Sequence, residues 1–185
     1  MDLAGQLRIQ ARANRLANFR LHGAMAALAP EEFAAPRTGF FPSLAGTLNH
    51  VLVVDLYYIG ALHGDADLVG LYDRFRPAAT VAELAARQAA SDERLIAFCD
   101  RLDAAGCEAV VDMPRRDHVQ RDRAAHVLAH LFMHQTHHRG QAHAMLSSTA
   151  VPPPQLDEFL MPTDARFRQA EMAALGWQEA PIYGP

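Results

Sequence analysis

Apolar residues recur at steps of three and four along four long stretches of the chain, which is the period of one face of an α-helix. The predicted helices cover residues 3–28, 43–62, 80–105 and 122–148. Prolines follow the first and the last of these stretches, where a helix cannot continue. The alternation of apolar and polar residues that is typical of strands is nearly absent, apart from one short segment at 109–111 that could be extended.

The second predicted helix is the most apolar of the four. Its residues 51–59 are apolar on nearly all sides and are interrupted only by Asp55. A helix that is hydrophobic all round is typical of the centre of a protein, so we expect this helix to be buried. Ser43 is its predicted N-cap, and Thr80 with Glu83 predicts a capping box at the start of the third helix.

Four helices of roughly 20–27 residues with a 3.6-residue apolar period predict an all-α four-helix bundle. The connections at 64–79 and 107–121 are long. About 16 extended residues can span the ~30 Å length of a 20-residue helix, so a crossover connection could let two successive helices run parallel. We expect one domain at 1–150 and a C-terminal extension at 151–185, which packs on the bundle and carries a short helix at 164–175.

The composition narrows the classes of protein that fit. The chain has 185 residues, half of them hydrophobic, and a net charge of −4, which suits one globular domain. No basic cluster is present, so nucleic acid is not an expected partner. A signal-peptide pattern and an apolar run of about 18 residues are both lacking, so we expect a soluble cytoplasmic protein with no membrane segment. Cys99 and Cys107 form no Cys-x-x-Cys pair, and Cys99 is expected to be a buried packing residue.

Three histidines lie within five positions in the stretch HQTHHRGQ, residues 134–141. They extend a series of histidines four residues apart, and each step exceeds a full turn by about 40°, so the whole series cannot share one ion. His134 and His138 fall on an apolar face, whereas His126 and His130 fall on a more polar one. The apolar face comprises Val127, Leu131, His134, His138, Gln141 and Met145. The more polar face comprises Arg123, His126, His130, Met133 and His137.

Two imidazoles side by side on a buried face need partners, because each unpaired nitrogen would cost about 1–3 kcal/mol. Each could be a hydrogen-bonded core histidine, or one metal ion could join His134 and His138. A third ligand would come from another helix, and His50, in the first half of the most apolar helix, is the best candidate. Three imidazoles suit Zn²⁺, Ni²⁺ or Fe²⁺ better than Ca²⁺ or Mg²⁺. Gln135 stands where a zincin peptidase has glutamate, so such a peptidase is not expected.

Three stretches of the chain resemble the DinB family of the DinB/YfiT-like superfamily. They are TLNHVLVVDLYY at 47–58, HQTHHRGQAHAML at 134–146 and RANRLANF at 12–19. The resemblance covers most of residues 1–150 and implies a four-helix bundle in up-down-down-up order, frequently a homodimer. It also implies a divalent metal bound by His50, His134 and His138. The chain departs from many relatives, which have an aromatic residue, often tryptophan, several residues after the first ligand, where this sequence has Leu56, Tyr57 and Tyr58.

The resemblance also implies what the site could do. Some relatives are thiol-dependent transferases or isomerases, so we expect a metal-dependent transferase or hydrolase. A low-molecular-weight thiol and a small electrophile are the expected partners of a transferase. Three neutral ligands leave the ion its full positive charge, which would lower the pKa of a bound water or thiol. The alternative is a non-catalytic, stress-associated protein in which the metal stabilises the bundle.

Side chains near the predicted ligands are candidates for orienting them. Asp55 could accept a hydrogen bond from a ligand or act as a base, or could instead be salt-bridged. Asn14 lies near the inner face of the first helix and could hydrogen-bond a ligand or a metal-bound water, and Gln141 could orient the site. Arg139 is turned about 100° from the adjacent ligand, which favours a structural salt bridge, and Gly140 is expected to allow close helix approach.

Overall fold

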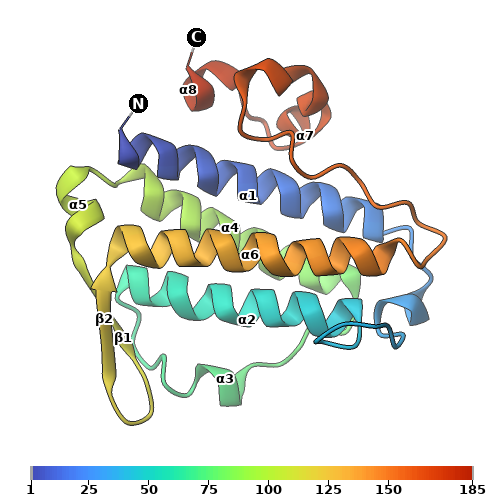
Figure 1. Cartoon of the computed structure of the whole chain (residues 1–185), viewed down its shortest axis with the longest axis horizontal. Coiled ribbons are helices and arrows are strands. Elements are labelled where there is room, and N and C mark those ends of the chain that lie inside the picture. Colours follow the sequence, from blue (N-terminus) through green and yellow to red (C-terminus); the bar gives the residue numbers. More distant parts are fainter. Residues whose placement is uncertain (1, 185) are drawn as a thin grey trace.

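The computed structural model describes residues 2–184 and is mostly helical, with one small two-stranded sheet. Four long helices lie side by side (Figure 1). They are α1 (Leu3–Met25), α2 (Leu44–His63), α4 (Val81–Asp100) and α6 (Ala124–Leu146). All four helices predicted from the apolar period are therefore present, although three of them are shorter than predicted at one end or both.

Shorter elements fill the connections and the C-terminal segment. They are the helices α3 (Leu71–Arg74), α5 (Ala104–Glu108), α7 (Gln169–Ala174) and α8 (Glu179–Tyr183), the strands β1 (Val110–Pro114) and β2 (Val119–Arg123), and the 3₁₀ turns Pro30–Phe33 and Pro162–Phe167. The single helix predicted at 164–175 is replaced by the second 3₁₀ turn and α7, and α8 was not predicted.

Three of the long helices have an N-cap side chain that accepts a hydrogen bond from the first turn. Asp2 and Ser43 accept hydrogen bonds from backbone N–H groups three residues ahead, at the starts of α1 and α2. Thr80 does the same at α4, at 3.1 Å from the nitrogen of Glu83. The Glu83 carboxylate in turn accepts from the backbone of Ala79 at 3.0 Å, so the predicted capping box forms with its return bond one residue earlier than usual.

Hydrogen bonds between the helices establish that α1 and α4 run in opposite directions. Arg12 in the first half of α1 pairs with Asp100 at the end of α4, at 2.7 Å. Further along α1, Asn18 donates to Asp92, which lies earlier in α4, at 3.0 Å. Rising residue numbers on one helix thus meet falling numbers on the other.

By contrast, α2 and α4 run in the same direction, as the colours in Figure 1 also show. Gln88 donates to Asp55 at 2.7 Å, and further along both helices the ring of His63 contacts the backbone oxygen of Arg94 at 3.0 Å. The connection at 64–80 therefore returns along the length of α2 before α4 begins.

The connection before α6 contains a β-hairpin, of which the sequence indicated only one extended segment, at 109–111. Its strands β1 and β2 pair in antiparallel register. Val111 and Met113 of β1 are buried, whereas β2 is mostly exposed and polar. The Tyr57 hydroxyl on α2 donates to the backbone oxygen of Pro114 at 2.7 Å, which holds the hairpin against α2.

Apolar clusters occupy the two ends of the long helices, with polar side chains between them. Ile59 and Leu131 belong to one cluster, and Leu21 and Leu48 belong to the other. Between these clusters all four helices contribute buried polar groups, which we call the polar layer. The polar layer comprises Asn14, Asn18, Asp55, Gln88, Asp92, Gln135 and Arg139.

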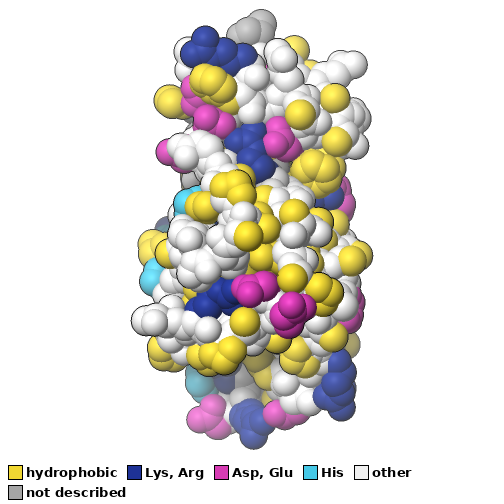
Figure 2. All heavy atoms as spheres, turned by 90° about the vertical axis from the view of Figure 1, so that its right-hand side faces the viewer, with side chains coloured by type: hydrophobic (Ala, Val, Ile, Leu, Met, Phe, Trp, Pro, Cys, Tyr) yellow, Lys and Arg dark blue, Asp and Glu magenta, His cyan; other side chains and the backbone are white. Residues whose placement is uncertain are grey.

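The helix α2 is buried along most of its length, as its apolar sequence predicted. Its length and composition alone would allow it to cross a membrane, but 72% of its most apolar 18-residue window is buried inside the protein. This burial is typical of a core helix. At the end of the molecule where α2 begins, acidic and basic side chains are interspersed with hydrophobic ones, so this face carries no large field of one sign (Figure 2).

The segment after α6 returns along α1 and is held there by one arginine. Arg20 of α1 donates to both carboxylate oxygens of Glu171, at 2.6 and 3.1 Å, and to Glu158 at 2.8 Å. It also donates to the backbone oxygens of Gln155 and Phe167. One side chain therefore ties three parts of the C-terminal segment to α1.

Replacing Arg20 by methionine is expected to destabilise the protein by about 3 kcal/mol, because two largely buried carboxylates and two carbonyls lose their donor. For a chain of this length that is a fall in melting temperature of about 6–12 °C. Thermal unfolding followed by circular dichroism measures it. The matched control is Arg8→Met on the same helix, since Arg8 has no ion pair among the described residues. Equal melting temperatures for the two variants would show that Arg20 does not hold the C-terminal segment against α1.

Candidate metal centre

The apolar face of α6 packs against α2, with the two helices antiparallel. Thr47 near the start of α2 contacts the sulfur of Met145 near the end of α6, at 3.7 Å. Asp55, further along α2, accepts from Gln135, which lies earlier in α6, at 2.9 Å. Between these two contacts the helices bring their histidines together.

His50 lies in the second turn of α2, and His134 and His138 lie one turn apart on α6. One ring nitrogen from each histidine lies within 4.8 Å of the other two. The Nε2 atoms of His50 and His134 are 3.0 Å apart, and the ring centroids of the three histidines are 4.5–4.9 Å apart. The structure thus groups the three histidines that were predicted as ligands, although they come from positions 84 residues apart.

Gln141 orients one of these rings. Its Oε1 accepts a hydrogen bond from Nδ1 of His138 at 2.7 Å, which leaves Nε2 of His138 with a free lone pair. An acceptor on the far nitrogen is the usual way in which a metal-binding histidine is held in one tautomer. The amide of Gln141 also donates to His137 at 3.2 Å. Gln141 therefore contacts a ligand candidate, as the sequence predicted.

The donor set fits a divalent transition ion. Bonds of about 2.0–2.1 Å from Zn²⁺ to imidazole nitrogen place two donors at most about 4.2 Å apart, close to the spacing of this cluster. Nδ1 of His134 is buried without a hydrogen-bond partner among the described residues. Its Nε2 contacts Nε2 of His50 at 3.0 Å, and an ion shared by these two nitrogens would take the place of that contact.

Phe41 completes the site and was not predicted. Its ring stacks on His50, with centroids 4.3 Å apart and planes 28° apart, and lies 5.7 Å from the ring of His138. The preceding Phe40 packs edge-on against it and is 82% exposed. The available signal was an aromatic pair in the loop just before the helix that carries His50. His138 is buried, but His50 and His134 are partly exposed, so the centre is accessible from one side.

Burial lowers the pKa of all three histidines, and neighbouring imidazoles add to the effect. The pKa of His134 falls to about 4, first because of desolvation and then because of the charges of His138 and His50. Desolvation is also the largest cause of the lowered pKa of His50 and of His138. The neutral form that binds metal is therefore favoured throughout the neutral range.

We expect bound metal to persist to a more acidic pH than exposed histidines would allow. Protons compete with the ion only when they can occupy the rings, and here that requires a pH below the ordinary histidine value of about 6.5. The difference in melting temperature between the metal-bound and the metal-free protein should persist to about pH 6 and shrink towards pH 4. Melting curves at one fixed, subsaturating free zinc concentration test this. A difference that stays constant across this range would contradict ligation by these histidines.

The histidines of the more polar face of α6 lie outside the centre, as predicted. His126 is exposed and its Nδ1 contacts Asp122 at 2.7 Å. His130 is exposed and its ring lies 5.1 Å from that of Tyr58.

Asp55 and Asn14, which were candidates for orienting the ligands, lie in the polar layer. Oδ2 of Asp55 accepts from Gln88 and Gln135, while its Oδ1 is buried without a partner among the described residues. Asn14 donates to Asp92 at 3.1 Å. Within the described part of the chain neither of them hydrogen-bonds a ligand histidine.

Arg139 has no salt bridge within residues 2–184, which corrects the expectation of one. Its Nη1 donates to the side-chain oxygens of Asn14 at 2.5 Å and Asn18 at 2.8 Å. The two asparagine amides in turn donate to Asp92. Gly140 does not mark a close helix approach either, because a Cβ added there would meet no atom within 4 Å.

The charges of the polar layer are strongly perturbed by burial. Desolvation raises the pKa of Asp55 to about 7, with a further contribution from the charge of Asp92. Desolvation also raises the pKa of Asp92 to about 6, against the hydrogen bonds from Asn18 and Gln88. Two buried carboxyls beside one buried arginine thus titrate near neutral pH.

Comparison with known proteins adds the family. The family model described as the DinB family matches residues 10–172. The match includes the helices that carry the three histidines and extends well into the segment that the sequence assigned to a C-terminal extension. No curated protein matches the chain.

Proposed function

Because the chain belongs to the DinB family, we propose that it is a metal-dependent enzyme that joins a low-molecular-weight thiol to a small electrophile. A hydrolase would use the same centre with water in place of the thiol. The observation that carries the proposal is the group of His50, His134 and His138, which is accessible from one side and lies near the exposed ring of Phe40. The packing of the four long helices supports a four-helix bundle in up-down-down-up order as its scaffold.

The side chains of the centre have separate roles in this proposal. His50, His134 and His138 hold the ion, and Gln141 keeps the Nδ1 proton on His138 so that its Nε2 faces the centre. Phe41 covers one face of His50 and keeps water from that side. Phe40 presents an apolar surface at the mouth, suited to the apolar part of an electrophile.

The ion would supply charge. Zn²⁺, Ni²⁺ or Fe²⁺ held by three neutral imidazoles keeps its dipositive charge and would lower the pKa of a thiol or water that reaches the open side. No charged side chain is among the three ligands, so this charge is not offset within the centre.

One preparation can test both parts of the proposal. Purified protein is loaded with each of the three metals, the bound metal is measured, and the loss of free thiol is then followed in mixtures of small thiols and electrophiles. The proposal expects turnover that disappears on chelation and returns when metal is added. Bound metal with no turnover across the panel, together with unfolding on chelation, would favour the stress-associated protein with a structural metal. The homodimer and the cytoplasmic location stay predictions from the sequence.

A further inference from the structure

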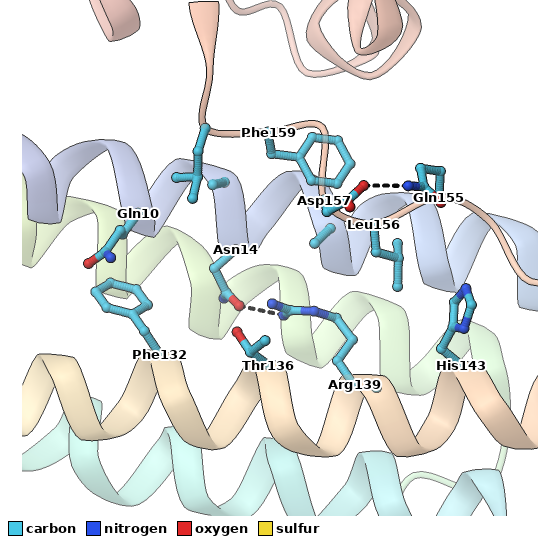
Figure 3. Close-up of a pocket in the computed structure, with 14 residues that line it drawn as sticks. Gln10, Asn14, Phe132, Thr136, Arg139, His143, Gln155, Leu156, Asp157 and Phe159 are labelled. Atoms are coloured by element: carbon cyan, nitrogen blue, oxygen red, sulfur yellow. Dashed lines mark hydrogen bonds between the residues drawn. The ribbon is translucent and has the colours of Figure 1, made fainter. Parts of the chain in front are cut away.

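A cavity of about 460 Å³ lies between α1 and α6, beneath the segment 155–160 of the C-terminal extension (Figure 3). Its volume is within the range of about 300–1,000 Å³ that is usual for small-molecule sites. Arg139 lies on its floor, next in sequence to the ligand His138 but turned about 100° around α6. The cavity therefore faces a different side of α6 from the metal centre.

The guanidinium of Arg139 is only partly used by the protein. Its Nη1 is bonded to Asn14 and Asn18, as Figure 3 shows for Asn14. Its Nε and Nη2 have no hydrogen-bond partner among the described residues. Both atoms keep some accessible surface, because neither is among the fully buried atoms that lack a partner. The side chain is 9% exposed and lines the cavity, so this free edge is accessible from the cavity.

The same edge binds carboxylates elsewhere in this chain. Arg20 uses Nε and Nη2 to hold the two oxygens of Glu171, and Arg168 uses the same two atoms to hold Glu179, at 2.9 and 2.8 Å. Two parallel N–H groups match the two oxygens of a carboxylate, which is why this pairing is strong and directional. In Arg139 the edge that would receive a carboxylate is the one left free.

The rest of the cavity wall is mostly apolar and well anchored. Phe132 rises from α6, and Leu156 and Phe159 descend from the segment above, where Leu160 also lines the cavity. That segment is held in place by Arg20, which also stacks on the ring of Phe159 at 4.5 Å. The cavity thus combines one unsatisfied cationic edge with a fixed apolar enclosure.

We propose that this cavity is a binding site for a small organic carboxylate with an apolar body, separate from the metal centre. The carboxylate accepts two hydrogen bonds from Nε and Nη2 of Arg139, while the apolar body lies against Phe132, Leu156 and Phe159. Gly140 also lines the cavity, and a Cβ added there would meet no atom within 4 Å.

Octanoate is a suitable probe, with 1-octanol as the uncharged ligand of the same chain length. Calorimetric titration into metal-free protein removes coordination of the carboxylate to the metal centre. Octanoate should bind about 10–100-fold more tightly than 1-octanol, since only the carboxylate has a negative charge and two oxygens that can accept a pair of hydrogen bonds from Arg139. Arg139→Met should abolish this preference, provided that circular dichroism shows a folded variant.

Gly140→Leu tests the site without touching the polar layer. A leucine at 140 would fill part of the cavity, so octanoate affinity should fall about tenfold or more. Gly23→Leu on α1 is the matched control, because Gly23 is also helical, has nothing within 4 Å of an added Cβ and lies away from the cavity. No binding of octanoate to the wild type, equal binding of octanol, or unchanged affinity in Gly140→Leu would each overturn the proposal.

Discussion

Replacing His134 by alanine should leave the purified protein almost free of metal, and His50→Ala and His138→Ala should do the same. The three rings are the donors whose nitrogens lie within 4.8 Å of one another, so the loss of any one opens the site to two ligands. Loss of a partner that merely orients a ligand costs about 10–100-fold in affinity, and loss of a ligand should cost at least as much. Element analysis and zinc titration of each variant measure the change.

Two further variants make this test specific. His126→Ala removes a histidine from the same helix that is exposed and contacts Asp122, so its metal content should equal that of the wild type. Gln141→Leu should keep the three donors but release His138, with a loss in affinity of about 10–100-fold. Normal metal loading of His134→Ala would refute the assignment of the centre.

Asp55→Asn should make the protein more stable relative to the wild type as the pH rises. Burial and the charge of Asp92 raise the pKa of Asp55 to about 7, whereas an unfolded aspartate titrates near 3.9. A raised carboxyl pKa contributes stability that is fully present below about pH 4 and is lost as the pH rises through about 7. The Asp55→Asn variant has no such loss. Its free energy of unfolding should therefore rise relative to that of the wild type by about 3 kcal/mol between about pH 4 and about pH 7.

Urea unfolding of metal-free protein at a series of pH values measures this difference. Chelation removes the pH-dependent binding of metal. The histidines of the centre then contribute equally to the pH dependence of stability in both proteins. Asp112→Asn is the control, since Asp112 is exposed on the hairpin and pairs with Arg121. Stability curves for wild type and Asp55→Asn that run parallel over the whole range would show that Asp55 titrates normally in the folded protein.

The long helices and the pair His134 and His138 could be predicted because their signals are local. His50 was added to the pair because it lies in the most apolar helix and because the family resemblance implies it. A period of three and four residues identifies each helix, and the same period places His134 and His138 on the face that packs against α2. Only part of the hairpin was indicated in this way, by the segment 109–111, because β2 is polar and exposed and has no apolar alternation.

Hydrogen bonds and ring contacts between residues far apart in the chain could not be predicted from local patterns either. Arg139 was recognised as a structural group, but its bonds to Asn14 and Asn18 join positions more than 120 residues apart. Phe41 comes from a loop, where periodicity has no meaning, and its stacking on His50 depends on how that loop closes over α2.

The polar layer also sets the axial alignment of the four helices. Apolar side chains would tolerate a slip of one helix by a turn, about 5.4 Å, because most of them would find other apolar neighbours. The same slip of α6 would separate Gln135 from Asp55 and Arg139 from its two asparagines, which would leave buried charges without donors or acceptors. Asp55 lies little more than one turn from His50 on α2, and Gln135 adjoins His134 on α6. The hydrogen bond between Asp55 and Gln135 therefore fixes the axial position of α6 relative to α2, and so keeps His134 and His138 opposite His50.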